Sequence, residues 1–172
     1  MELAARTPKP QFMLSTSVFN RVNEILKDLE RSTRAELAIF SEYSGIPITQ
    51  VGKHNVMDIG DFSSVAAGNY AATREMAKML GEESAFRFLY LEGDNKNIYL
   101  CNIGYDFLLT IIFAKSVALG MVRIYANKAV RQLNDLLDQA NEQEDQVEES
   151  IIDNEFNLLL GDALDSSFNR AE

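Results

Sequence analysis

Apolar residues recur at helical spacing in three long segments of the chain, and shorter apolar runs lie between them. The first helix is predicted to begin near Ser15 or Ser17, because either hydroxyl can cap it, and its apolar positions then repeat every three or four residues. The second helix is predicted over about residues 62–80, with Asp61 as its N-cap and Gly81 just after its C-terminus.

Five strands and a third helix complete the predicted order of elements. Two of the strands, 35–42 and 107–114, are apolar on both faces, so they should lie centrally in a sheet that is covered on both sides. The third helix is predicted over residues 117–140. The order predicts an α+β fold, α-β-β-α-β-β-β-α, with a five-stranded, mostly antiparallel sheet and helices on both faces. The predicted strands are residues 35–42, 48–52, 85–92, 97–103 and 107–114.

The second helix carries small residues on more than one side. If Ala72 lies at the centre of the sheet-facing side, Val65, Met76 and Met79 complete an ordinary core stripe. The outer side then holds an alanine band surrounded by charges, which favours contact with another protein, although alanine is also simply the best helix former. The residues predicted to bind a partner are Ala67, Tyr70, Ala71, Arg74, Glu75 and Lys78.

The strand at 85–92 is a candidate for self-association. If it lies at the edge of the sheet, its unpaired backbone groups invite pairing with a second copy of the chain. A twofold dimer would join the two sheets and set the two second helices side by side. We therefore expect a homodimer that works by contact.

The two ends of the chain differ from its centre. Residues 1–14 are predicted to be a flexible leader, residues 15–140 a single domain, and residues 141–150 an acidic linker. The linker is interpreted as either a docking surface or a solvated connection. Residues 151–172 form an amphipathic tail that either folds back on the domain or binds a partner, with a face that contains Ile152, Phe156 and Leu159.

Composition and residue types argue against several kinds of function. The net charge of −10 argues against binding to nucleic acid or to an anionic membrane surface. Cys101 is the single cysteine, which excludes an internal disulfide and fits a cytoplasmic protein, and it is interpreted as a buried structural residue. The single histidine, His54, lies in a polar segment and is interpreted as an ordinary loop residue. We expect no catalytic site, no cofactor and no metal.

Several short motifs follow one another in the central part of the chain. They are Ala66-Ala-Gly-Asn-Tyr-Ala-Ala72, Leu80-Gly-Glu82, the hairpin that ends in Ile98-Tyr-Leu100, and Phe107-Leu-Leu-Thr-Ile-Ile-Phe-Ala114 followed by Ser116-Val-Ala-Leu-Gly-Met-Val-Arg123. In order and spacing they resemble the Roadblock/dynein light chain family, and within it the bacterial MglB branch. The resemblance covers about residues 15–140 and agrees with the predicted order of elements.

The resemblance implies a homodimer formed through the second helix and the third strand, with Phe86, Phe88 and Tyr90 in the dimer interface. It implies that the paired second helices dock a small Ras-like, MglA-like GTPase that acts in cell polarity or motility. The chain would activate GTP hydrolysis by that partner without being an enzyme itself. The resemblance also implies that a C-terminal extension touches the GTPase, which makes the tail at 151–172 a second contact.

Three alternatives accompany this interpretation. The dimer is also suited to act as a non-activating scaffold for a GTPase or for another Roadblock subunit. A small-molecule sensor is a further alternative, against which large core residues such as Phe107 and Phe113 argue because they leave little room for a cavity. Arg74 is a candidate arginine finger, but the resemblance implies that MglB-like activators supply no catalytic arginine.

Overall fold

The structure is a computed structural model that describes residues 14–53, 57–82, 86–104 and 106–142. A third helix is described from residue 119 to residue 142. The order of elements confirms the predicted α-β-β-α-β-β-β-α arrangement. The other elements are α1 (Thr16–Thr33), β1 (Leu37–Glu42), β2 (Pro47–Gly52), α2 (Ile59–Met79), β3 (Phe88–Glu92), β4 (Lys96–Ile103) and β5 (Phe107–Ala114).

The five strands form one antiparallel sheet with the order β2-β1-β5-β4-β3. Both strands predicted to be central lie inside it, β1 between β2 and β5, and β5 between β1 and β4. Every residue of β5 except the last is buried. Strand β3 lies at one edge of the sheet, as the dimer hypothesis requires, and β2 lies at the other.

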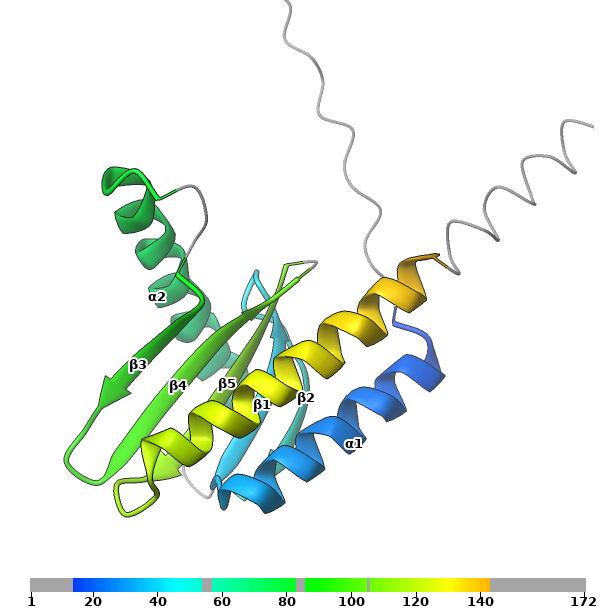
Figure 1. Ribbon diagram of the computed structural model, residues 1–172, viewed down its shortest axis with the longest axis horizontal. Helices are drawn as coiled ribbons and strands as arrows, with labels where there is room; N and C mark the ends of the chain where they lie inside the picture. The colour runs from blue at the N-terminus through cyan, green and yellow to red at the C-terminus, as the bar shows by residue number, and fades with distance from the viewer. Residues whose placement is uncertain (1–13, 54–56, 83–85, 105, 143–172) are drawn as a thin grey trace, which may run out of the picture.

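Helices cover both faces of this sheet. Figure 1 shows α1 and the third helix side by side on one face, with α2 on the other. Strand β1, one of the two doubly apolar strands, packs against the helices on both faces of the sheet. Its Ala38 and Phe40 lie in the large core under α1 and the third helix. Leu37 and Ile39 of the same strand belong to a smaller cluster that includes Phe62 of α2.

Helix α1 begins as predicted. Ser15 is its N-cap, and the Ser15 hydroxyl accepts a hydrogen bond from the backbone N–H of Val18 at 3.3 Å. Val22 and Leu26 are fully buried, whereas Phe19, another member of the predicted apolar set, is 36 % exposed. The apolar and charged residues of α1 occupy opposite faces of the helix, so the sequence pattern predicts correctly which face is buried.

Helix α2 begins earlier than predicted and ends where predicted. Its N-cap is Asp58 rather than Asp61, and an Asp58 carboxylate oxygen accepts a hydrogen bond from the backbone N–H of Asp61 at 2.9 Å. Asp61 lies in the first turn, where a negative charge is favourable near the helix N-terminus. At the other end, Gly81 has a φ of +75°, and the backbone N–H groups of Gly81 and Glu82 bond back to the last turn, which is a Schellman motif.

Some predictions fall outside the described residues. These are the leader up to residue 13, His54, and the segment 143–172 with Ile152, Phe156 and Leu159. Among the residues that the structure does describe, no helix is both long enough and apolar enough to cross a membrane.

Candidate protein interface

One side of α2 packs closely on the sheet through small and hydroxyl-bearing residues. Tyr70 is fully buried, and its hydroxyl donates a hydrogen bond to the backbone carbonyl of Phe86 at 2.6 Å. Its ring meets Tyr43 edge to face, with centroids 5.8 Å apart. Burial raises the pKa of Tyr70 to about 12. The buried residues of the helix are Ser63, Ala67, Tyr70, Thr73 and Ala77.

The prediction of which side of α2 faces the sheet was therefore wrong. Val65, Met76 and Met79 were predicted to be core residues, but they are 72 %, 50 % and 85 % exposed. Ala67 and Tyr70 were predicted to bind a partner, but both are buried against the chain's own sheet. The physical reason is that small residues let the helix lie close to the sheet, while larger apolar residues occupy the outside. Apolar periodicity alone selects the larger residues as the core.

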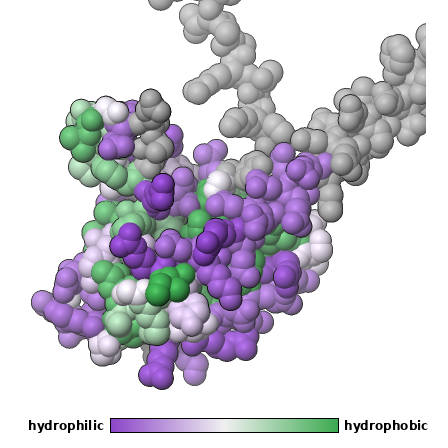
Figure 2. Space-filling view, in the orientation of Figure 1, coloured by the Kyte–Doolittle hydropathy of each residue, from purple (hydrophilic) through white to green (hydrophobic). Residues whose placement is uncertain are grey.

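The outside of α2 carries an unpartnered apolar stripe. Residues at intervals of three and four fall on one face of a helix, and here they are Val65, Gly68, Ala72, Met76 and Met79. All of them are exposed. A methyl group added at Gly68 would meet no atom within 4 Å. Figure 2 shows apolar atoms at the end of α2 that projects beyond the sheet. We call these five residues the apolar stripe.

A charged flank lies beside the stripe on the same helix, formed by Ala71, Arg74, Glu75 and Lys78. These residues were predicted to face outward, and the structure places Arg74, Glu75 and Lys78 at the surface with Ala71 half-buried. Lys78 and Glu75 form an exposed ion pair with an N–O distance of 2.6 Å. The guanidinium of Arg74 lies over the ring of Tyr43, 5.1 Å from its centroid.

Strand β3 combines a free edge with aromatic side chains. Among the described strands it pairs with β4 alone. Phe88 stacks on Tyr99 and Tyr90 stacks on Phe113, so these two predicted dimer residues are half-buried against the chain's own core. Phe86, the third, is 37 % exposed. The edge therefore offers backbone groups to a partner, while the side chains of Phe88 and Tyr90 are already packed.

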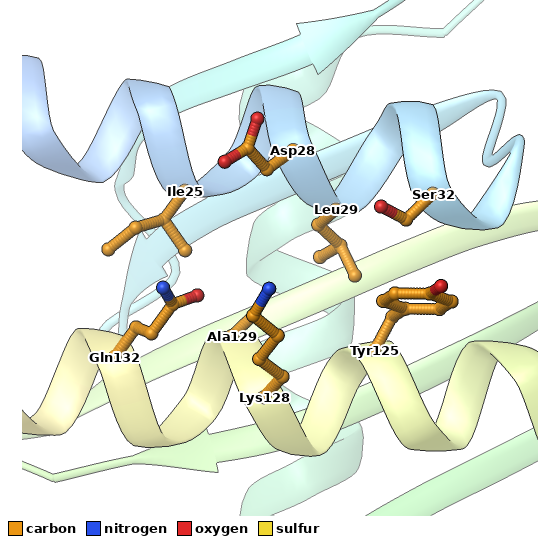
Figure 3. Close-up of a pocket in the computed structure, with 8 residues that line it drawn as sticks. All are labelled: Ile25, Asp28, Leu29, Ser32, Tyr125, Lys128, Ala129 and Gln132. Carbon is orange, nitrogen blue, oxygen red and sulfur yellow. The ribbon is translucent and has the colours of Figure 1, made fainter.

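Other parts of the described chain offer little for ligand chemistry. Cys101 is buried, and burial raises its pKa to about 12, so the thiol is unreactive at neutral pH. No cluster of three metal-binding side chains occurs among the described residues. Figure 3 shows a narrow groove between α1 and the third helix, lined by residues such as Asp28, Tyr125 and Lys128. Its volume of about 10 Å³ holds roughly one water molecule.

Comparison with known proteins assigns the chain to a family. The sequence pattern of the Roadblock/LC7 domain family matches residues 21–113, more than half of the chain. The chain belongs to the Roadblock/LC7 domain family. It is 29 % identical over 93 residues to an uncharacterised protein of Aquifex aeolicus, in an alignment that spans 51 % of this chain and 57 % of that protein.

Solved structures show the same likeness. Myxococcus xanthus MglB is 27 % identical with a TM-score of 0.68, covering 70 % of this chain and 98 % of that one. Gliding protein MglB of Thermus thermophilus shares the fold at 24 % identity with a TM-score of 0.70, covering 77 % of this chain and 99 % of that one. The family and the fold together support a Roadblock-type regulator.

Proposed function

We propose that this chain is a homodimeric regulator that activates a small Ras-like, MglA-like GTPase in cell polarity or motility. The observation that carries the proposal is the apolar stripe of α2, which lies uncovered in a chain that belongs to the Roadblock/LC7 domain family. The likeness to Myxococcus xanthus MglB supports the choice of partner.

The stripe is proposed to meet the same stripe of a second copy. Gly68 supports this, because an exposed glycine inside a helix costs roughly 1 kcal/mol relative to alanine and no described residue of its own chain needs the space. A glycine at such a position allows another backbone to approach closely. The edge of β3 adds a second contact, because two such edges can pair and extend the sheet across the dimer.

The charged flank is proposed to dock the GTPase. In a twofold dimer, the two stripes face each other and the two flanks lie outside them, forming one platform. The dimer would hold the switch regions of the GTP-bound partner so that the partner's own residues are positioned for hydrolysis. The chain is thus proposed to have no catalytic site of its own.

Arg74 is proposed to bind rather than to catalyse. Its guanidinium already interacts with the ring of Tyr43, and it would have to leave this contact to reach a phosphate. An arginine finger contributes about a thousandfold or more to the hydrolysis rate. With an MglA-like GTPase of the same organism, we expect Arg74→Ala to weaken binding while the rate at saturating regulator stays within about tenfold of the wild type.

The test is single-turnover GTP hydrolysis by that GTPase, with and without the full chain. Acceleration at saturating regulator supports activation, and binding without acceleration selects the scaffold alternative. Docking at the flank is tested by Lys78→Glu, which breaks the exposed pair with Glu75. Arg21→Glu is the matched control, because Arg21 and Glu24 of α1 form a pair of the same spacing and distance. Equal binding by both variants would move the docking site elsewhere.

A further inference from the structure

Charge is strongly segregated along the last third of the chain. Residues 116–134 contain three basic residues and no acidic residue, in a chain with a net charge of −10. Residues 135–169 contain eleven acidic residues and no basic residue. The basic residues are Arg123, Lys128 and Arg131, and all three are exposed on the third helix. Within the described residues, none of them forms an ion pair within 4 Å.

The same helix carries apolar residues beside these charges. Leu119 is 36 % exposed and Ile124 is 67 % exposed. Toward the edge of the sheet, the guanidinium of Arg123 lies over the ring of Phe88 in β3, 5.0 Å from its centroid. Tyr90, on the same strand, is half-buried. Figure 1 shows that no described helix crosses in front of β3 on this face. Figure 2 shows apolar atoms over the start of the third helix.

We propose that this surface, which we call the basic flank, docks the chain's own C-terminal segment, residues 143–172. The basic flank consists of Leu119, Arg123, Ile124, Arg131 and the exposed side of Phe88. The segment matches it in chemistry, because it carries nine acidic residues and one basic residue together with an apolar face that contains Ile152, Phe156 and Leu159.

The length of the segment fits this site. It starts where the description of the third helix ends, at residue 142, and the acidic stretch 143–150 is proposed to run back along that helix. From residue 142 back to residue 124 the third helix spans about 27 Å at about 1.5 Å per residue, and residues 143–150 would span about 26 Å if extended, at about 3.3 Å per residue. A returning segment therefore brings Ile152 and Phe156 beside Ile124 and Arg123.

Tethering makes a weak contact sufficient. Exposed ion pairs are individually weak and are screened by salt, so a free peptide would bind poorly. A segment joined to its site by a short linker experiences an effective concentration in the millimolar range. The bound fraction should fall as salt rises. The basic flank lies on the face of the sheet opposite α2, so this contact does not rest on the proposed GTPase interface.

The test is hydrogen–deuterium exchange of the full chain, read in residues 143–172 and 119–131. At low salt, the double variant R123E/R131E should raise exchange in the C-terminal segment about tenfold, while the melting temperature of the domain stays close to that of the wild type. The control is R21E/R31E on α1, which changes the net charge equally but alters no residue of the basic flank and should leave this exchange unchanged.

A second variant tests the other side of the proposed contact, the C-terminal segment itself. E148R/E149R places positive charges in the segment and should raise exchange there by a similar factor. Equal exchange in the wild type and R123E/R131E at low salt would overturn the proposal. Protection of residues 143–172 that grows with protein concentration would also overturn it, because the segment would then dock on a second copy.

Discussion

Replacing Met76 with glutamate should separate the proposed dimer while leaving the protomer folded. Met76 lies near the middle of the apolar stripe and is 50 % exposed in the single chain. Complete burial of a methionine side chain is worth about 1.5–3 kcal/mol, so covering the exposed half contributes about 1 kcal/mol per copy. A twofold interface uses the residue twice, which gives about 2 kcal/mol from this side chain alone.

The new carboxylates add a further penalty. In a twofold contact, two glutamates at this position would lie in or near an apolar interface without a cationic partner, which costs at least as much again. The combined loss of about 4 kcal/mol corresponds to a rise in the dimer dissociation constant of roughly a thousandfold. The free energy of unfolding of the isolated protomer should change by less than about 1 kcal/mol, since the side chain is half exposed.

Sedimentation equilibrium over a range of protein concentrations measures this constant, and circular dichroism confirms that the fold is kept. Phe19→Glu is the matched control, because Phe19 is 36 % exposed but lies on α1, across the sheet from α2. An unchanged dissociation constant for Met76→Glu would refute the assignment of the stripe. So would an equal loss in both variants, because it would point to a general effect of added charge.

Three further predictions concern stability. Tyr70→Phe should lower the free energy of unfolding by about 1 kcal/mol, because it removes a hydrogen bond. Tyr99→Phe should raise the free energy of unfolding, because the buried Tyr99 hydroxyl has no hydrogen-bond partner among the described residues. Urea unfolding measures both values, and a loss of stability in Tyr99→Phe would contradict the second prediction. Burial raises the pKa of both hydroxyls to about 12, so the unfolded chain loses these protons before the folded chain does. The contribution of these two groups to stability should therefore be complete below about pH 10 and fall as the pH rises to about 12. Melting temperatures across this range test the sign, and a flat profile would refute the prediction. Gly45→Ala should lower the free energy of unfolding by about 1–3 kcal/mol, because Gly45 has a φ of +95° and the new methyl carbon would lie 2.7 Å from the Cα of Ser64. A melting temperature equal to that of the wild type would contradict this prediction and show that the turn can move away from α2.

The pattern of the sequence was sufficient for the sheet and for α1. Strand β5 was predicted with its observed bounds, because its apolar run is closed by polar residues at both ends. Helix α1 was placed with the correct face inward, because charged residues fill its outer side.

The faces of α2 could not be assigned from periodicity, because the larger apolar residues lie on the uncovered face and the buried face holds small and hydroxyl-bearing residues. One side meets the chain's own sheet and the other is left uncovered, so the larger apolar residues do not mark the core. Two signals in the sequence point to the observed orientation. Tyr70 has a hydroxyl that a buried site can satisfy with one backbone carbonyl, and Gly68 is a costly residue on a helix face that has no role in its own domain.

The N-terminal end of α2 was missed for a simpler reason. Asp58 and Asp61 are both good capping residues, three positions apart, and the apolar residue Ile59 between them extends the helix to the earlier one. Residues 141 and 142 of the predicted acidic linker belong to the third helix, whereas the rest of the linker and the C-terminal tail lie outside the described residues, so their assignments remain predictions.

The most direct test of the central claim is the dependence of GTP hydrolysis on the dimer. Single-turnover hydrolysis by an MglA-like GTPase of the same organism would be measured with the wild type, Met76→Glu and Phe19→Glu, each at a concentration where the wild type is dimeric and Met76→Glu is monomeric. The account predicts acceleration by the wild type and by Phe19→Glu, and a rate with Met76→Glu equal to that of the GTPase alone. Equal acceleration by the monomeric variant, or no acceleration by the dimeric wild type, would contradict it.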